Sequence, residues 1–323
     1  MELTRKENIM GMAAAFLGCM IFGFTFVFTK QVLNAGMSPY ALLAWRMIIA
    51  SLAMAALAAC GVFKMRFGGK RLLRLLPVSL AEPCLYFVFE SYGIARTTAS
   101  ESGTIISFIP ITVLIFTRLF FKERHTRGQL IGVLLSVIGI ICVVLSGGFS
   151  ARFSLSGYLL LFGAVFSAAF YNIGVRSVQD EFNSAEITFG NNVLGLLFFT
   201  LLACGEGLVN GNFAAMWLLP LQNTQVLMNI LLLALGASIG AFMLIIYAIG
   251  AIGPTRYSTF AGITTITSIL FGLILLGERM LPGQLLGAAM VIVGVWSANY
   301  FTEARGEKTE DREQQEVYEK GDM

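Results

Sequence analysis

This 323-residue sequence contains two similar stretches 155 positions apart: KERHTRGQLIGVLLSVIGI (122–140) and GERMLPGQLLGAAMVIVGV (277–295). Residues 123–140 and 278–295 agree at seven of eighteen positions, including a Glu-Arg pair and a Gly-Gln-Leu run. In each stretch the glycines recur along one side of a helix: Gly128, Gly132 and Gly139, then Gly283, Gly287 and Gly294. Small residues on one side of a membrane helix let a neighbouring helix come close. The repeat therefore predicts two related, closely packed helices.

The similarity continues upstream of these stretches. At the same shift of 155 residues, the segment SFIPITVLIFTRLFFKER (107–124) aligns with GITTITSILFGLILLGER (262–279), and an Ile, a Thr and a Phe are identical. We therefore expect two homologous halves, residues 1–150 and 151–302, with five membrane spans each. Because five is odd, the two halves enter the membrane from opposite sides. Inverted repeats of this kind are typical of secondary transporters, whose binding site lies at the repeat interface near the membrane midplane.

The composition supports a membrane protein. Apolar residues make up 57% of the chain and charged residues 13%, with a mean hydropathy of +0.78, whereas soluble domains average about 45–50% and about 25%. A span needs about 20 mostly apolar residues. Ten such runs follow one another, and they predict an all-α membrane protein with ten transmembrane helices: 10–33, 39–62, 75–95, 100–121, 127–147, 155–176, 186–209, 225–250, 254–276 and 281–302. The run at 225–250 is long enough to be tilted or broken.

The distribution of lysine and arginine predicts the orientation, because cytoplasmic loops carry the excess of these residues. With the N-terminus inside, seventeen basic residues fall on the inner side and four on the outer side. Both termini are therefore expected in the cytoplasm, and the charged segment 303–323 is expected to be a solvated cytoplasmic tail. We expect a multi-pass protein of the cell membrane, that is, a bacterial inner membrane.

On these features the sequence resembles the drug/metabolite transporter superfamily, in the branch with two EamA-type repeats. The resemblance covers residues 10–302. Three features show the resemblance: the two sets of five spans, the segment PYALLAWR (39–46), and the segment from Ala99 to Gly139 together with the similar segment in the second half. It implies a secondary carrier, often an exporter of amino acids or other small metabolites, with a central cavity between the halves. The sequence departs from the family pattern in two places: Thr265 stands where the first half has Pro110, and Glu101 replaces a small residue.

One arginine lies within a predicted span. Arg46 is about seven residues inside the second span, hence about 10 Å deep at 1.5 Å per residue. A central arginine costs about 2.5–3.5 kcal/mol on insertion scales. Its side chain either snorkels to the outer interface, binds an anionic group, or pairs with a carboxylate in the membrane. Because Glu90 is predicted at a similar depth, we expect an Arg46–Glu90 ion pair, direct or through one water.

The third span carries two glutamates, Glu82 and Glu90, with Tyr86 between them. At 100° per residue the three side chains fall within an arc of about 80°. A polar face of this kind inside a span points into the bundle, since lipid would reject it. The glutamates either serve transport or merely balance arginine and bond to backbone. If transport is proton-coupled, Glu82 is the predicted switch, because it is deeper than Glu90 and its own span offers it no basic partner.

Uncharged polar residues are concentrated in the second half. Of these, Tyr171, Asn172 and Tyr247 are expected near the cavity, with Tyr86 and Glu82 facing them from the first half. Asparagines and threonines in spans also hold helices together, and this interpretation stays open for each residue. The candidate substrate-binding set is therefore Arg46, Glu82, Tyr86, Glu90, Tyr171, Asn172 and Tyr247.

The function expected from the sequence is secondary transport, in the direction of export, of a small organic metabolite such as an amino acid or a drug-like compound, by alternating access. A non-transporting membrane scaffold and an intramembrane enzyme are the alternatives. Clustered His, Asp or Cys at ligand spacing is missing from the sequence, so we expect no catalytic residue, metal site or cofactor. The expected partners are the substrate and the lipid bilayer, without nucleic acid. The sequence leaves open whether protons or a counter-substrate drive transport. It also leaves open the identity of the substrate, the direction of transport and the oligomeric state.

Overall fold

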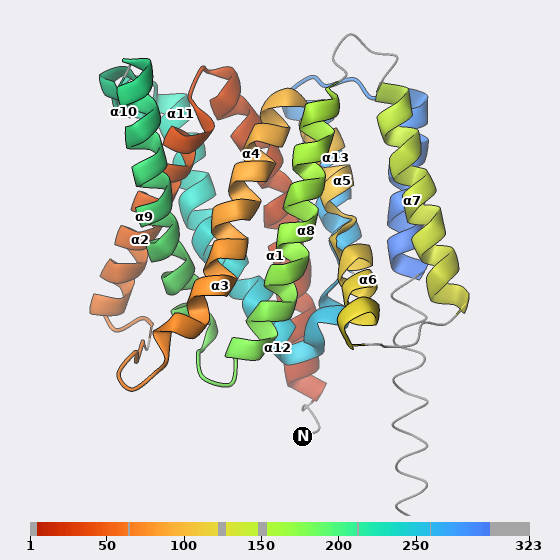
Figure 1. The fold of residues 1–323 in the computed structure, drawn as a ribbon, viewed down its shortest axis with the longest axis horizontal. Helices are drawn as coiled ribbons and strands as arrows, with labels where there is room; N and C mark the ends of the chain where they lie inside the picture. The colour runs from red at the N-terminus through yellow and green to blue at the C-terminus, as the bar shows by residue number, and fades with distance from the viewer. Residues whose placement is uncertain are drawn as a thin grey trace, which may run out of the picture.

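The computed structural model describes residues 5–63, 65–121, 127–147, 154–211, 213–258 and 260–297. This part of the chain is all-helical and contains no strand (Figure 1). Seven helical segments are long and apolar enough to cross a membrane: Glu7–Asn34, Pro39–Ala59, Leu72–Arg96, Ala99–Phe116, Leu155–Val178, Ser184–Asn210 and Thr224–Gly253. Three further apolar helices are shorter: Leu130–Ser146, Gly262–Leu275 and Pro282–Ser297. The chain is thus a multi-pass, all-α membrane protein.

The first half contains nine helical elements within the described residues. They are α1 (Arg5–Asn34), α2 (Pro39–Ala59), η1 (Leu72–Arg74), α3 (Leu75–Ser79), η2 (Leu80–Leu85), α4 (Tyr86–Arg96), α5 (Ala99–Ile106), α6 (Ile109–Phe121) and α7 (Arg127–Gly147). The run predicted as one span at 75–95 is therefore divided among α3, η2 and α4. The segment 122–126, which includes His125, lies outside the described residues.

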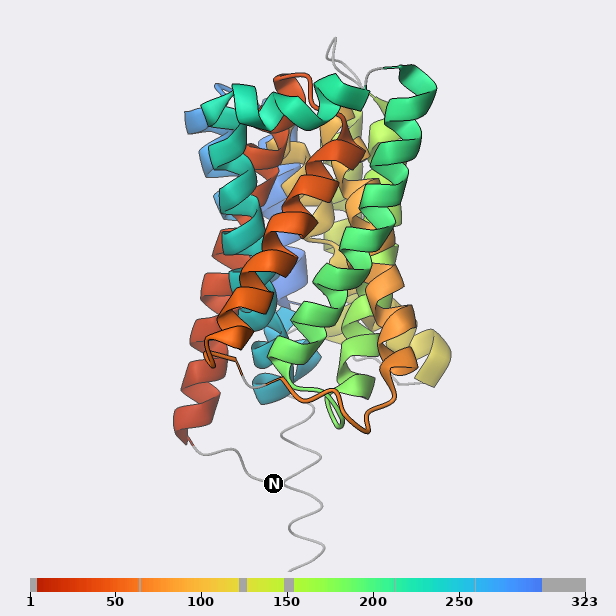
Figure 2. The ribbon, with the colours of Figure 1, turned by 90° about the vertical axis from the view of Figure 1, so that its left-hand side faces the viewer.

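The second half follows a similar order. Its elements are α8 (Leu155–Val178), α9 (Ser184–Asn210), α10 (Phe213–Gln222), α11 (Thr224–Leu231), η3 (Leu232–Ala241), α12 (Phe242–Ser258), α13 (Ala261–Leu275) and the helix Pro282–Ser297, which we call the last helix. It differs from the first half in the added helix α10 and in having one helix, α13, where the first half has α5 and α6. The short helix α10 was not predicted; it lies across the end of the bundle (Figure 2). The tail expected at 303–323 lies outside the described residues.

Side-chain caps fix where several helices begin. Thr98 accepts the Glu101 N–H while Glu101 accepts the Thr98 N–H, and Asn183 and Glu186 form the same capping box at the start of α9. Such boxes satisfy helix N–H groups that have no partner in the first turn. Both boxes lie at ends of the bundle, so α5 and α9 start at defined points.

Two helices lose regular geometry at equivalent places of the two halves. Segments η2 and η3 are π-helical, and η2 contains a non-helical residue, Glu82, at φ −144° and ψ 122°. Shifted by 155 residues, Leu80–Leu85 falls on 235–240, inside η3. Irregular backbone at membrane depth is tolerated only where it is buried in protein or lines a cavity. Both interruptions therefore fit a place in the interior of the bundle, where each has several buried residues.

The repeated glycine pattern brings the two related helices together. A Cβ placed on Gly139 of α7 would lie 2.6 Å from the carbonyl oxygen of Gly287, and one on Gly294 would lie 2.6 Å from that of Gly132. Ser136 Oγ also donates to the carbonyl of Val291 at 3.4 Å. The prediction of close helix packing is confirmed. The two repeated segments, on α7 and on the last helix, pack against each other.

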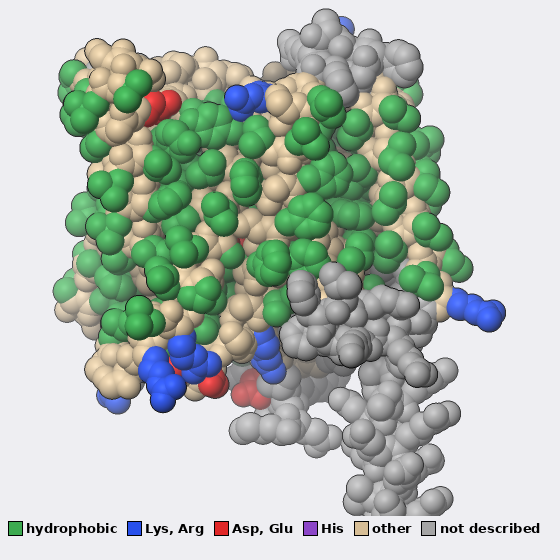
Figure 3. Space-filling model, viewed as in Figure 1, with side chains coloured by type: hydrophobic (Ala, Val, Ile, Leu, Met, Phe, Trp, Pro, Cys, Tyr) green, Lys and Arg blue, Asp and Glu red, His purple; other side chains and the backbone are tan. Residues whose placement is uncertain are grey.

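The halves also interlock elsewhere. Helix α2 packs on α9, α4 on α8, and α1 on both α12 and α13. One large cluster of buried side chains, including Phe26, Phe87, Tyr171 and Phe242, spans both halves. On the outside, apolar side chains cover the middle of the bundle, while lysine and arginine gather at the end where the 65–74 segment lies (Figure 3). The apolar belt fits a lipid-facing surface.

Candidate functional site

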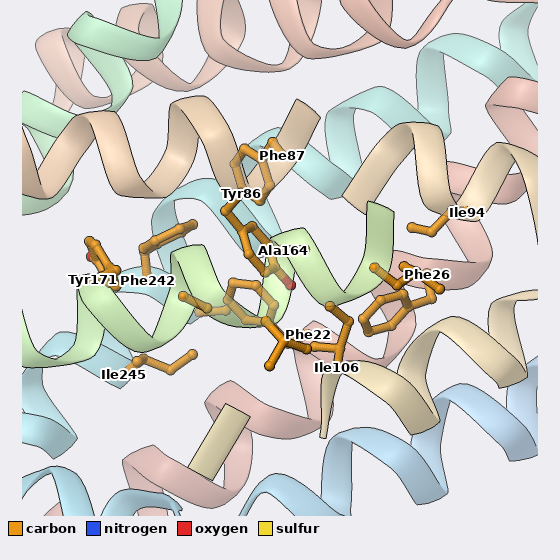
Figure 4. Packing of buried hydrophobic residues seen from close by; sticks show 14 of the residues in the cluster. Phe22, Phe26, Tyr86, Phe87, Ile94, Ile106, Ala164, Tyr171, Phe242 and Ile245 are labelled. Carbon is orange, nitrogen blue, oxygen red and sulfur yellow. The ribbon is translucent and has the colours of Figure 1, made fainter. Parts of the chain in front are cut away.

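A cavity of about 80 Å³ lies in the centre of the bundle, between the halves. Its wall is built from α1, η2, α4, the break between α5 and α6, α8, α12 and α13. Figure 4 shows Phe22, Tyr86, Ile106, Tyr171 and Ile245 gathered from five of these helices. Four of the predicted residues line this cavity together: Glu82, Tyr86, Tyr171 and Asn172. Its volume suffices for several water molecules.

Glu82 enters the wall through the interruption of the third span. Its extended backbone within η2, followed by Pro83, takes it out of regular helix geometry. The side chain is 6% exposed, and within the described part of the chain it has no hydrogen-bond or ion-pair partner. Burying a carboxylate without a partner is costly, so the fold holds Glu82 at this place at the expense of stability.

Tyr86 and Glu90 form a buried pair on α4, one turn apart. The Tyr86 hydroxyl donates to Glu90 Oε1 at 2.7 Å, and both side chains are 2% exposed. Tyr86 lines the cavity, whereas Glu90 is not among the lining residues. Tyr86 and Glu90 thus lie on one side of α4, whereas the predicted arc with Glu82 assumed a regular helix, which η2 interrupts at Glu82.

Arg46 is buried rather than snorkelling, with 1% exposure. Its Nε donates to Ser238 Oγ in η3 at 2.6 Å, and its guanidinium carbon lies 4.2 Å from the centre of the Phe87 ring. Arg46 and Glu90 interact electrostatically, but the described residues show no nitrogen–oxygen contact between them within 4 Å. The direct form of the predicted ion pair was wrong, because Ser238 and Phe87 hold the guanidinium. One nitrogen, Nη2, has no hydrogen-bond partner among the described residues.

Tyr171 is held at the cavity by Asn191, which is itself held by Ser79. Asn191 Nδ2 donates to the Tyr171 hydroxyl at 3.0 Å, and Ser79 Oγ donates to Asn191 Oδ1 at 2.7 Å. Asn192 donates to the Ser238 carbonyl at 3.2 Å. The asparagines of α9 therefore connect helices, as one of the two interpretations of the sequence predicts, and Asn191 also positions a cavity residue.

Tyr247, which was predicted to lie near the cavity, does not line it. Tyr247 lines a different pocket, which it shares with Glu7, Arg176 and Gln179 near the end of the bundle where α1 begins. The wall residue of this part of α12 is Ile245. Two residues further along a helix the side chain has turned by about 200°, so Tyr247 faces away.

At the end of the bundle that holds the basic segment 65–74, polar contacts join the two halves. Lys70 pairs with Glu186 at 2.5 Å, and Arg74 pairs with Glu181 at 2.8 Å. The Arg71 N–H donates to Glu181 at 2.5 Å. This backbone hydrogen bond and the Arg74 guanidinium lower the pKa of Glu181 below its ordinary value, which keeps the carboxylate ionised at neutral pH. We call these contacts the basic-end bridge.

At the opposite end, two glutamates join the halves. Glu278 accepts hydrogen bonds from the Ala99 N–H, the Ser100 N–H and Ser100 Oγ, at 2.7, 3.0 and 2.6 Å. Glu101 accepts from the Tyr158 hydroxyl at 2.9 Å and from Gln284 Nε2 at 2.5 Å. We call these contacts the opposite-end bridge. Glu101, noted in the sequence as a departure, thus links the fourth span to two helices of the other half.

Several wall residues were not predicted from the sequence, among them Cys19, Phe242 and Tyr257. These residues are apolar or weakly polar in apolar surroundings, so neither charge nor spacing distinguishes them from core residues. The position of η2 could have been suspected from Pro83 alone. The matching place of η3 has no proline, and there the signal was the length of the run at 225–250, which contains η3.

Comparisons with known proteins agree with this architecture. The model of the EamA-like transporter family matches twice, over residues 9–145 and 155–300. YcxC, an uncharacterized transporter of Bacillus subtilis, is 28% identical over 298 residues, which cover 92% of this chain and 95% of the relative. A probable terminal-alkyne amino-acid exporter of Streptantibioticus cattleyicolor is 24% identical, with 68% of this chain and 70% of the relative covered. A crystal structure with 13% identity covers 87% of this chain and 97% of the other at a TM-score of 0.57, which concerns the fold alone.

Proposed function

The chain belongs to the EamA-like transporter family, and on that premise we propose that it is a secondary transporter that exports a small organic metabolite by alternating access. The observation that carries the proposal is the central cavity, whose wall both halves build around the unpaired carboxylate of Glu82. Amino acids and drug-like compounds are the substrate classes that we consider first; one relative is a probable amino-acid exporter.

We propose further that the fold is two inverted repeats of five spans each, residues 1–150 and 151–302. Three observations support this arrangement. The family model matches each half once, the π-helical segments η2 and η3 fall at equivalent positions, and α7 and the last helix meet through their shared glycines. The proposed count of ten spans adds the three shorter apolar helices to the seven long segments.

The bridges at both ends suggest how access alternates. The basic-end and opposite-end bridges each join the first half to the second, and the cavity lies between them. A cavity of about 80 Å³ is far below the roughly 300–1,000 Å³ of ligand pockets, so substrate binding requires that it widen. Opening the basic-end bridge, on the proposed cytoplasmic side, admits substrate, and opening the opposite-end bridge releases it outside.

The function is tested by flux. We expect the purified protein in proteoliposomes to move at least one compound from a panel of amino acids, nucleobases, sugars and drugs, with or without a pH gradient. Empty liposomes and liposomes with an unrelated membrane protein serve as controls. A scaffold or an intramembrane enzyme predicts no flux of any compound, and that result would remove the proposal.

Topology is tested by labelling. We propose cytoplasmic N- and C-termini, since the basic 65–74 segment lies at the same end of the bundle as the start of α1 and cytoplasmic loops carry the basic excess. In a cysteine-free background, Gly68→Cys should react only from inside and Ala35→Cys only from outside. Gly68 has open space around it and Ala35 is exposed. Labelling of both from one side would contradict the span count.

Energy coupling is tested at Glu82. We expect Glu82→Gln to abolish the response of transport to a pH gradient, because the amide cannot bind and release a proton, while exchange at saturating substrate continues. Glu206→Gln is the matched control, because Glu206 is a half-buried glutamate of α9 outside the cavity wall and should leave coupling intact. If Glu82→Gln still concentrates substrate in response to a pH gradient, Glu82 does not carry the proton.

A further inference from the structure

The charge of the cavity wall constrains what can bind there. Among the described residues that line the cavity, Glu82 is the one charged side chain. It is 6% exposed and has no hydrogen-bond or ion-pair partner in the described part of the chain. Carboxylates inside membrane spans pair with an opposite charge or face a water-filled cavity, and they mark substrate and ion pathways. The partner that Glu82 lacks within this part of the protein is a cation.

The groups around Glu82 leave one positive charge missing. Its charged neighbours are Glu90 and Arg46, which both interact with it electrostatically. The other titratable side chains near it are neutral in their protonated forms: Tyr86, Tyr171, Tyr257 and Cys19. Two carboxylates therefore face one guanidinium, and this buried group carries a net charge of −1 when all three are ionised. In a low-dielectric interior that excess is costly.

The rest of the wall suits an apolar molecule with a cationic end. Five aromatic rings line the cavity: Phe22, Tyr86, Tyr171, Phe242 and Tyr257. Aromatic faces attract organic cations and also pack against apolar groups. Polar groups are few, with Asn172, Ser107 and Thr264 as the uncharged examples.

Resting on the proposed transport function, we propose that the cavity selects protonated organic amines with an apolar or aromatic body, and that Glu82 pairs with their ammonium group. An anionic substrate would meet the carboxylate of Glu82 and add to the net charge of −1 carried by Glu82, Glu90 and Arg46. A zwitterion would need a cation in the wall for its carboxylate, but Arg46 is outside the lining and is held by Ser238 and Phe87. A single positive charge neutralises the site.

Binding to the purified protein in nanodiscs tests this selectivity with probes that share one body. The probes are 2-phenylethylamine, the neutral 2-phenylethanol, the anionic phenylacetate and the zwitterion phenylalanine. We expect the amine to bind at least about tenfold more tightly than each of the others, which corresponds to about 1.4 kcal/mol and is modest for a desolvated charge pair. Equal or tighter binding of the alcohol, the acid or phenylalanine would overturn the proposal, as would failure of all four to bind.

Variants at one position assign the selectivity to Glu82. Glu82→Gln should weaken amine binding about tenfold and leave binding of the alcohol unchanged, because only the charge is removed. Glu82→Asp, which keeps the charge, should retain preference for the amine, and Glu206→Gln should bind like the parent protein. Equal weakening of amine and alcohol in Glu82→Gln would mean that Glu82 only shapes the cavity. If Glu82→Gln does not fold, the Glu82→Asp variant and the four-probe comparison still decide.

The outcome is separable from that of the transport proposal. Flux of an anionic or neutral metabolite, together with the lack of any preference for amines, would leave transport standing and remove this substrate class. Selective binding of 2-phenylethylamine without flux of any compound would keep the cation site and remove the transport function.

Discussion

Replacing Arg46 by alanine is expected to lower the free energy of unfolding by about 3–5 kcal/mol, the range measured when one member of a buried set of charges is removed. Arg46 is 1% exposed and is the one cation in the described part of the chain that interacts electrostatically with both Glu82 and Glu90. Without it, two carboxylates remain in the membrane interior with no compensating charge. The hydrogen bond to Ser238 and the contact with Phe87 are lost as well. Equilibrium unfolding in mixed micelles, followed by circular dichroism, measures the change.

A second substitution separates charge from packing. Arg46→Ala combined with Glu90→Gln removes one of the two uncompensated charges and should be more stable than Arg46→Ala alone. Arg71→Ala is the control, because the Arg71 side chain is exposed and its bridging contact with Glu181 uses the backbone N–H; surface substitutions usually stay within about 0.5 kcal/mol. If the double variant is no more stable than Arg46→Ala, the loss comes from packing against Phe87 and not from charge.

The candidate site was predictable as far as charge and polarity reveal it. Glu82, Tyr86, Tyr171 and Asn172 were expected together, and they line one cavity. Polar residues in apolar spans are costly unless they face the interior, so composition alone identifies them. Details that depend on helix rotation were beyond the sequence. Tyr247 was expected near the cavity from its polarity, but the rotation of α12 places Ile245 in the wall instead.

The polar contacts of Arg46 illustrate a second limit. Its depth in the span and that of Glu90 were estimated from residue counts, and the two residues do interact electrostatically. The hydrogen-bond partner, however, is Ser238, 192 positions away and in the other half. A contact between distant segments depends on how the halves pack, which a single sequence does not encode in any local pattern. The same holds for Glu278, whose three donors lie at the start of α5.

The fold was predictable because it is repeated. The hydropathy runs correspond to the helical segments, and the glycines of the two repeated segments lie where α7 and the last helix meet. Helix α10 lies in the connection between the seventh and eighth runs, for which no helix was predicted, although FAAMWLLPLQ is apolar enough to form a helix at the membrane surface. With 10 residues, α10 is too short to span, which agrees with its position across the bundle end.

Gly139→Leu is expected to separate α7 from the last helix, with a loss of stability of at least about 1–3 kcal/mol, as for overpacked cores. A Cβ at this position would lie 2.6 Å from the Gly287 carbonyl oxygen and 2.8 Å from the Val291 backbone nitrogen. Backbone atoms of a helix cannot move aside as a flexible side chain can, so the helices must part. Gly287→Leu meets the Gly139 carbonyl at 2.5 Å and should have the same effect. Thermal unfolding followed by size-exclusion chromatography measures both.

The control for this prediction is another helical glycine. A Cβ added at Gly205 of α9 would meet no atom within 4 Å, and this glycine is exposed on the outside of the bundle. Gly205→Leu should therefore be neutral or slightly stabilising, since glycine is a poor helix former. Because α7 belongs to the first half and the last helix to the second, Gly139→Leu should also abolish flux where Gly205→Leu retains it. If leucine is tolerated equally at positions 139 and 205, the two repeated segments do not contact each other. Close helix packing would then not explain the sequence repeat.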